Sequence, residues 1–103
     1  MRLIDRINHV LDNYDDKEAI VRVEIMLAEE PSVINNYDEF DDSGVIIPLR
    51  EVELGNRAFG IVFGCPSARN GDWINTSPVE CIERINDNIS LIHTENSRYL
   101  VIT

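Results

Sequence analysis

The densest group of chemically active side chains in this sequence is a short acidic run, in which Asp38, Glu39, Asp41 and Asp42 surround Phe40. Carboxylate oxygens of this kind can bind a hard cation such as Ca²⁺. The run lacks the alternating Asp/Asn order, the central glycine and the final glutamate of a calcium-binding loop. We therefore interpret it as a solvated acidic loop or as a surface that contacts a protein, and we expect no metal ion or other cofactor.

The residue types that carry catalysis or bind zinc are few in this chain, and their spacing is unfavourable. The two histidines, His9 and His93, have no Gly-x-Ser-x-Gly nucleophile turn near them. Cys65 and Cys81 form no C-x-x-C pair, match no zinc pattern together with the histidines, and are too few for a disulfide framework. The sequence also has no glycine-rich loop for phosphate. We expect a protein that is not an enzyme, with no catalytic residue.

Negative charge is concentrated in the first half of the chain. Residues 1–56 contain fourteen Asp and Glu against five Lys and Arg, whereas residues 57–103 contain five against four. A field of this sign repels nucleic acids and membranes and attracts basic protein surfaces. The four arginines of the second half are scattered among acids, so the sequence does not predict direct binding to nucleic acid.

Length and composition predict one domain over residues 1–103, with a largely helical acidic part in 1–44 and a β part in 45–103. Apolar residues make up 44% of the chain and charged residues 27%, which is ordinary for a globular domain. The longest nearly uninterrupted apolar run, residues 25–28, is far shorter than the roughly 20 residues of a membrane span. Asp5 comes too early for a secretory signal. We expect a cytoplasmic protein.

Two helices are predicted in the first part. Residues 2–13 carry apolar side chains at helical spacing, namely Leu3, Ile4, Ile7, Val10 and Leu11. Asp15, followed three residues later by Glu18, has the pattern of a capping box, which would begin a second helix at about residue 16 that ends before Pro31. The alternation through residues 19–27 also fits a β-strand, because β-branched residues are frequent there. Helix and strand both stay open, with the helix preferred.

The rest of the chain is predicted to form a loop and then strands. Residues 31–44 have loop composition. The strand-like runs that follow are 45–47, 49–54, 58–63, 73–85 with an interruption at Pro78, 89–93 and 99–102. Turns are expected at Gly55-Asn56, at residues 86–88 and at residues 94–97. The predicted fold class is α+β: an N-terminal helix or helical hairpin, followed by a small antiparallel sheet or barrel of four to five strands.

Residues 57–102 contain a series of short motifs in a recognisable order. They are Gly60-Ile61-Val62-Phe63-Gly64, Asn70-Gly71-Asp72-Trp73-Ile74, Thr76-Ser77-Pro78-Val79 and Thr94 with Asn96-Ser97-Arg98-Tyr99. This order resembles small β-rich accessory proteins encoded by phages and prophages. The resemblance implies an accessory gene that acts in a bacterial host cell, and it supplies no catalytic residue.

The leading hypothesis is a non-enzymatic acidic inhibitor in phage–host conflict, such as an anti-CRISPR protein, an anti-restriction protein or a nuclease immunity protein. Its negative surface would occupy the basic nucleic-acid groove of a partner protein, and Tyr14, Tyr37 and Phe40 would act as aromatic anchors. The predicted partner-binding residues are Asp12, Asp15, Asp16, Glu29, Glu30, Tyr37, Asp38, Glu39, Phe40, Asp41 and Asp42. A bland alternative is that the charge only keeps the protein in solution.

A second hypothesis belongs to a different class, a small-ligand-binding protein that sequesters a nucleotide immune signal. Trp73 would stack on the base and arginines would hold the phosphates, in one chain or across a homo-oligomer interface. The predicted ligand-binding residues are Arg57, Arg69, Trp73, Thr76, Asn96 and Arg98. The threonine and the asparagine of this set also fit a purely structural role, because such side chains hydrogen-bond strand ends and turns.

Overall fold

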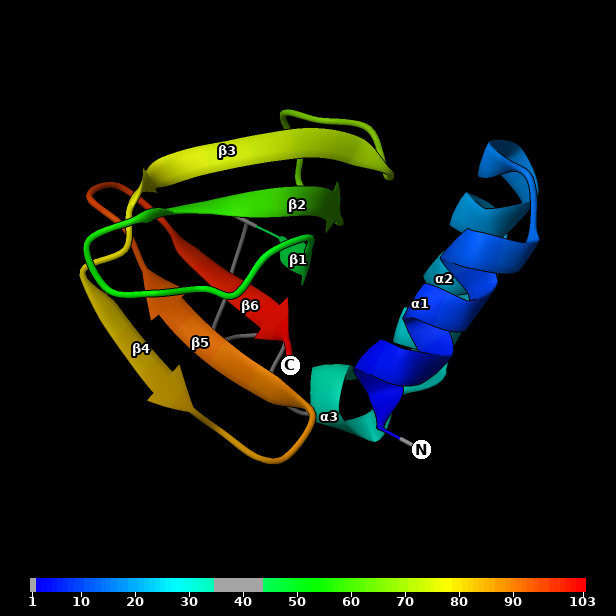
Figure 1. Ribbon diagram of the computed structural model, residues 1–103, viewed down its shortest axis with the longest axis horizontal. Helices are drawn as coiled ribbons and strands as arrows, with labels where there is room; N and C mark the ends of the chain where they lie inside the picture. The colour runs from blue at the N-terminus through cyan, green and yellow to red at the C-terminus, as the bar shows by residue number, and fades with distance from the viewer. Residues whose placement is uncertain (1, 35–43) are drawn as a thin grey trace.

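The computed structural model describes residues 2–34 and 44–103, which form a helical layer and a curled β-sheet (Figure 1). The helices of these residues are α1 (Leu3–Asn13), α2 (Asp16–Glu29) and α3 (Pro31–Ile34). The strands are β1 (Val45–Pro48), β2 (Arg57–Phe63), β3 (Asp72–Pro78), β4 (Cys81–Arg84), β5 (Ile89–His93) and β6 (Arg98–Ile102). The α+β class and the order of its parts are confirmed, but the sheet has six strands instead of four to five.

The two predicted helices form an antiparallel hairpin. Leu3, Ile4 and Ile7 are buried on one face of α1, as their spacing predicts. The Asp15 carboxylate accepts a hydrogen bond from the backbone N–H of Glu18 at 2.9 Å, so it caps the N-terminus of α2. Residues 19–27 are helical, which decides the alternative that the sequence left open.

The prediction of a loop from residue 31 is wrong at its start. The backbone N–H groups of Val33 and Ile34 both donate to the carbonyl of Glu30 at 3.0 Å, which makes the short helix α3. Pro31 begins this helix because its missing N–H and fixed φ suit a first helical position. The acidic run and Tyr37 lie outside the described residues, so the expectations for Tyr37, Asp38, Glu39, Phe40, Asp41 and Asp42 are not addressed by the structure.

The strands follow the order β3-β2-β1-β6-β5-β4, and only β1 and β6 are parallel in this part of the chain. The three predicted turns are confirmed. At Gly55-Asn56 the N–H of Asn56 donates to the carbonyl of Glu53 at 3.2 Å. The side-chain oxygen of Asn86 accepts from the N–H of Asn88 at 2.8 Å and thereby joins β4 to β5. The N–H of Thr94 donates to the carbonyl of Ser97 at 2.9 Å and joins β5 to β6.

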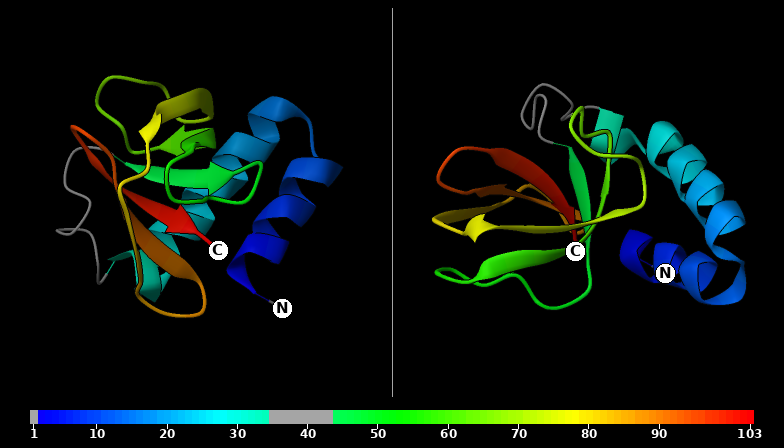
Figure 2. Two further views of the ribbon diagram at one scale, coloured as in Figure 1. Left: turned by 60° about the vertical axis from the view of Figure 1, so that its left-hand side comes forward. Right: turned by 90° about the horizontal axis from the view of Figure 1, so that it is seen from above.

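The run 73–85 forms two strands on opposite edges of the sheet, not one interrupted strand. After Pro78 the chain turns, and the N–H of Val79 donates to Asn56 beside β2 at 2.9 Å. The next N–H, from Glu80, donates to His93 of β5 at 2.7 Å. These two bonds hold the two edge strands near each other, so the sheet curls toward a barrel (Figure 2).

The strand predicted at 49–54 is absent from the described sheet. Leu49 still donates its N–H to the carbonyl of Phe59 at 3.0 Å, but the chain then leaves the ladder. Val52 turns inward and packs against buried residues inside the curled sheet, among them Ile46 and Ala58. Gly55 adopts a φ of 83° where the segment reverses. Residues 49–56 thus cross one end of the curled sheet because burying Val52 competes with continuing the strand.

Alternate residues of the strands supply two separate cores. Val45, Ile47, Ile61 and Phe63 pack against α1 and α2 on the outer face of the sheet. Their neighbours point the other way into the curl, where they form the second cluster with members Ile46, Ala58, Val62, Val79, Ile92 and Val101. The helices cover one end of the β2–β3 ribbon and leave the rest of its outer face open (Figure 1).

Candidate partner-binding surface

The acidic residues of the helical layer are divided between its two ends. Asp12, Asp15 and Asp16 are exposed around the turn that joins α1 to α2. Glu29 ends α2 and Glu30 follows it, beyond a 14-residue helix that is about 20 Å long. The structure therefore brings three of the predicted acids together and places the other two at the opposite end of the layer.

Tyr14, which the sequence predicts to be an aromatic anchor, already contacts an arginine of the same chain through its ring. Its ring lies 4.0 Å from the guanidinium carbon of Arg22. Arg22 also forms an ion pair with Glu18 at 3.0 Å, one turn earlier on α2. One face of Tyr14 is thus covered by the cation of its own helix hairpin.

The carboxylates at the C-terminus of α2 oppose the helix dipole. Neither α1 nor α2 carries a basic residue in its last turn, and α2 ends at Glu29 with Glu30 as its C-cap. Negative charge at this end of a helix is unfavourable, because the free carbonyl groups already carry partial negative charge. In the described ranges the ion pairs are Arg2–Asp5, Arg22–Glu18 and Arg84–Asp87, all exposed and local, so they neutralise little of this charge.

The outward face of α2 is apolar, a feature that the sequence analysis missed. Val21 is 54% exposed and Ile25 51% exposed, although both lie in the middle of a helix. Exposed Glu24 and Glu29 flank them on the same helix. The signal was present in the alternation that suggested a strand, since the apolar residues of α2 are spread around the helix and cannot all lie on one buried face.

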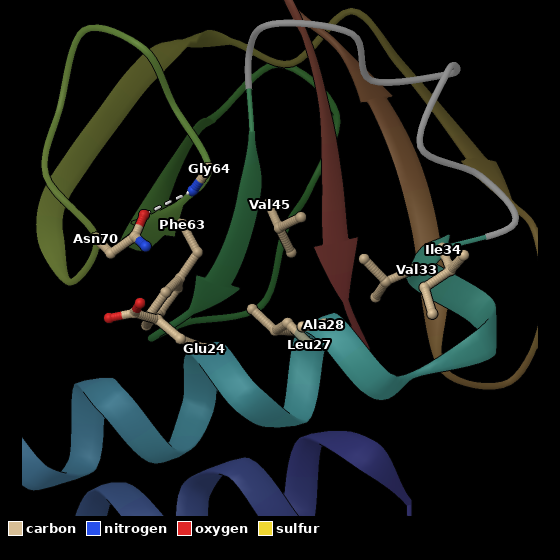
Figure 3. A pocket seen from close by; sticks show the side chains of 9 residues that line it. All are labelled: Glu24, Leu27, Ala28, Val33, Ile34, Val45, Phe63, Gly64 and Asn70. Carbon is tan, nitrogen blue, oxygen red and sulfur yellow. Dashed lines mark hydrogen bonds between the residues drawn. The ribbon is translucent and has the colours of Figure 1, made fainter.

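A pocket of about 420 Å³ opens beside this helix, between α2, α3 and the ends of β1 and β2 (Figure 3). Its walls are Glu24, Leu27, Ala28, Val33, Ile34, Val45, Phe63, Gly64 and Asn70. Glu24 lies at one end near Asn70, whose side-chain oxygen accepts from the N–H of Gly64 at 2.8 Å. None of these described lining residues is Lys or Arg, so the pocket combines an apolar wall with one negative charge.

Two of the residues predicted to bind a nucleotide, Thr76 and Arg57, form hydrogen bonds to backbone groups of the sheet. Thr76 is 4% exposed; its hydroxyl accepts from the N–H of Ala58 at 3.0 Å and donates to the carbonyl of Ser77 at 2.7 Å. Arg57 donates to the carbonyl of Thr76 at 3.0 Å. Thr76 therefore fits the structural role that the sequence offered, and its side chain faces no open site.

The remaining members of that set lie at two ends of the sheet. Arg69 belongs to the β2–β3 connection, which lies on the side of the helices together with the start of β3 (Figure 2). Trp73, the second residue of β3, lines a cleft with Asp16 of α2. Asn96 and Arg98 belong to the β5–β6 hairpin, whose turn lies at the far end (Figure 2). Arg57 and Trp73 line separate pockets. One chain does not bring these side chains together.

The histidines and cysteines of the described residues do not lie together in one site. His9 is exposed on α1, where its carbonyl accepts from the Asn13 side chain at 2.7 Å. Within residues 2–34 and 44–103, no three His, Cys, Asp or Glu side chains are arranged to hold a metal ion. Cys65 and Cys81 are both free thiols. None of the described helices is long and apolar enough to span a bilayer.

Comparison of the chain with protein-family models, with curated proteins and with solved structures finds no match.

Proposed function

We propose that this protein is a non-enzymatic acidic inhibitor that binds the basic, nucleic-acid-binding surface of a partner protein through its helical layer. The supporting observation is the outward face of α2, where Val21 and Ile25 are each more than half exposed beside Glu24 and Glu29, with Lys17 and Arg22 also exposed along this helix. An apolar centre with a charged rim is the usual composition of a protein interface. The net charge of −10 selects a basic partner and speeds its association.

The biological setting belongs to the same proposal. The motifs of residues 57–102 resemble phage accessory proteins, and an acidic surface that excludes nucleic acid from a basic groove suits the conflict between a phage and its host. Anti-CRISPR, anti-restriction and nuclease-immunity proteins are the classes that this chemistry serves. The site of action would be the cytoplasm of the bacterial host cell.

The test is capture of partners on the immobilised chain from host lysate, with the captured proteins identified by mass spectrometry. We expect a basic nucleic-acid-binding protein to be retained at about 50 mM salt and largely released at about 300 mM, because screening shortens the range of the attraction. Excess duplex DNA should compete, since both ligands occupy the same groove. The Val21→Ala/Ile25→Ala double variant should lose the partner while its stability is unchanged or slightly raised, because alanine favours the helix.

Leu54→Ala is the matched control, because Leu54 is an exposed apolar side chain, 63% exposed, in the segment between β1 and β2. It should capture the partner as well as the unaltered chain does. Retention of proteins that are not basic, or equal capture by the double variant, would contradict the proposal.

The exposed indole of Trp73 favours a second candidate function, the sequestration of a nucleotide signal. Since one chain separates Trp73 from Arg98, such a pocket would have to form between two copies. Adenine and guanine nucleotides should then raise the melting temperature of the oligomer, because a ligand that binds only the native state stabilises it. Trp73→Ala and Arg98→Ala should each remove the effect, and a monomer that no nucleotide stabilises would exclude this function.

A further inference from the structure

A second cleft lies on the same side of α2, nearer its N-terminus. It has a volume of about 270 Å³, and its walls are Leu11, Asp16, Ala19, Ile20, Leu49, Ile61, Gly71 and Trp73. A β-carbon at Gly71 would lie 2.5 Å from Cδ1 of Ile20, so helix and loop are in close contact there. Ile20 and Gly71 both line the cleft, and Gly71 directly follows Asn70, which lines the pocket of Figure 3.

Trp73 forms an open aromatic wall of this cleft. It is 66% exposed, and it stacks on Phe59 with ring centroids 5.5 Å apart. Arginines of the chain already lie over two other rings, Arg50 over Phe59 at 5.6 Å and Arg22 over Tyr14. No cation from the described residues lies over Trp73 in this way. The indole therefore keeps a surface that can still attract a cation.

Asp16 supplies the charge at the opposite wall. It is the first residue of α2, it is exposed, and within the described ranges its carboxylate has no hydrogen bond or ion pair. The other described residues that line the cleft include no Lys or Arg. The cleft thus presents a free carboxylate, an indole face and the apolar side chains of Leu49 and Ile61.

We propose that this cleft binds an arginine side chain of the basic partner, an inference that rests on the proposed function. The aliphatic stem of the arginine packs on Leu49 and Ile61, and its guanidinium group stacks on Trp73 while pairing with Asp16. Arginine fits better than lysine because its planar group stacks on aromatic faces and pairs with both carboxylate oxygens at once. The site would fix the register of the partner on the helical layer.

The test needs no partner protein, because Trp73 is the only tryptophan in the chain and its fluorescence reports the cleft directly. The probes are a capped Ala-Arg-Ala tripeptide and the same peptide with citrulline, the neutral analogue of arginine, titrated at constant ionic strength. We expect saturable binding of the arginine peptide, with binding of the citrulline peptide weaker by about three- to tenfold, because citrulline loses both the exposed ion pair and the cation–π contact.

Asp16→Asn should weaken binding of the arginine peptide by less than the change to citrulline does, because the variant removes the ion pair but keeps the contact of the guanidinium with Trp73. Glu83→Gln is the control, because it removes one exposed carboxylate from β4 on the opposite edge of the sheet. Circular dichroism verifies that both variants are folded. Equal binding of the two peptides, no saturable change, or unaltered binding by Asp16→Asn would overturn the arginine site.

These results separate the arginine site from the proposed function. If neither peptide binds, but the chain still captures a basic protein that the Val21→Ala/Ile25→Ala variant loses, the arginine site is wrong and the proposed function stands. If the arginine peptide binds through Asp16 but no basic protein is captured, the cleft is supported and the proposed function fails.

Discussion

Thr76 and Trp73 lie three residues apart on β3 and have different roles. Thr76 is buried, and both hydrogen bonds of its hydroxyl go to backbone groups of β2 and β3. Trp73 is exposed and leaves part of its ring open at the cleft. At the scale of single residues, one polar side chain therefore maintains the sheet, while one apolar side chain is available to a partner.

Replacing Thr76 by valine tests the structural role. The substitution keeps the shape but leaves the buried N–H of Ala58 without its acceptor, which costs about 1–3 kcal/mol of the free energy of unfolding. Urea denaturation measures the loss, with an unchanged slope if only stability is altered. Asn75→Ala, at an exposed position of the same strand, should stay within about 0.5 kcal/mol. A Thr76→Val protein as stable as the parent would show that this bond contributes nothing.

Helix α2 combines a well-capped beginning with an unfavourable end. Asp15 satisfies the first turn, and Ala19, Val23 and Leu27 are buried against the sheet and α1. The C-terminal turn carries Glu29 with no cation in the same turn, and the outward face carries apolar residues. Features that lower stability without a compensating contact are expected where function requires them.

Glu29→Gln should therefore raise stability and lower partner binding. Removal of the charge from the C-terminus of α2 should add about 0.3–1 kcal/mol to the free energy of unfolding. The same variant should capture less of the basic partner because the acidic rim loses one carboxylate. Glu18→Gln, in the first turn, should have the opposite effect on stability, since Glu18 faces the positive end of the helix and pairs with Arg22. Equal changes in the free energy of unfolding of the two variants, measured by urea denaturation, would rule out the explanation by the helix dipole.

On the scale of the whole molecule, the charge of −10 is poorly balanced. The ion pairs in the described parts of the chain are exposed and join residues three or four positions apart. Such pairs contribute little, whereas repulsion among the remaining carboxylates opposes the compact state. The strong negative field of the surface thus lowers the free energy of unfolding.

Sodium chloride should therefore raise the melting temperature. Between about 20 mM and 500 mM salt the Debye length falls severalfold, so repulsion between exposed carboxylates is screened. A gain of about 1 kcal/mol corresponds to a shift of roughly 4–8 °C for a domain of this size. Calorimetry with chloride, not sulfate, makes the test specific, because sulfate also strengthens apolar burial. A melting temperature that falls with salt would mean that favourable ion pairs outweigh the repulsion.

The sequence by itself determined features that depend on near neighbours. The spacing of Leu3, Ile4 and Ile7 and the cap at Asp15 require contacts within one or two turns of helix. The turn at Asn86 likewise requires only a side chain that bonds its own backbone two residues on. The net charge and its asymmetry follow from counting residues. In each of these cases, residues close together in the sequence are sufficient to determine the feature.

Only the tertiary structure decided what depends on distant partners. It placed β3 and β4 on opposite edges, because Val79 and Glu80 find acceptors at Asn56 and His93. It also determined which apolar residues of α2 are buried, which the helical period does not encode because these residues are spread around the helix among charged ones. The cleft between Asp16 and Trp73 exists for the same reason: two segments far apart in the chain are brought together by packing, which no local pattern specifies.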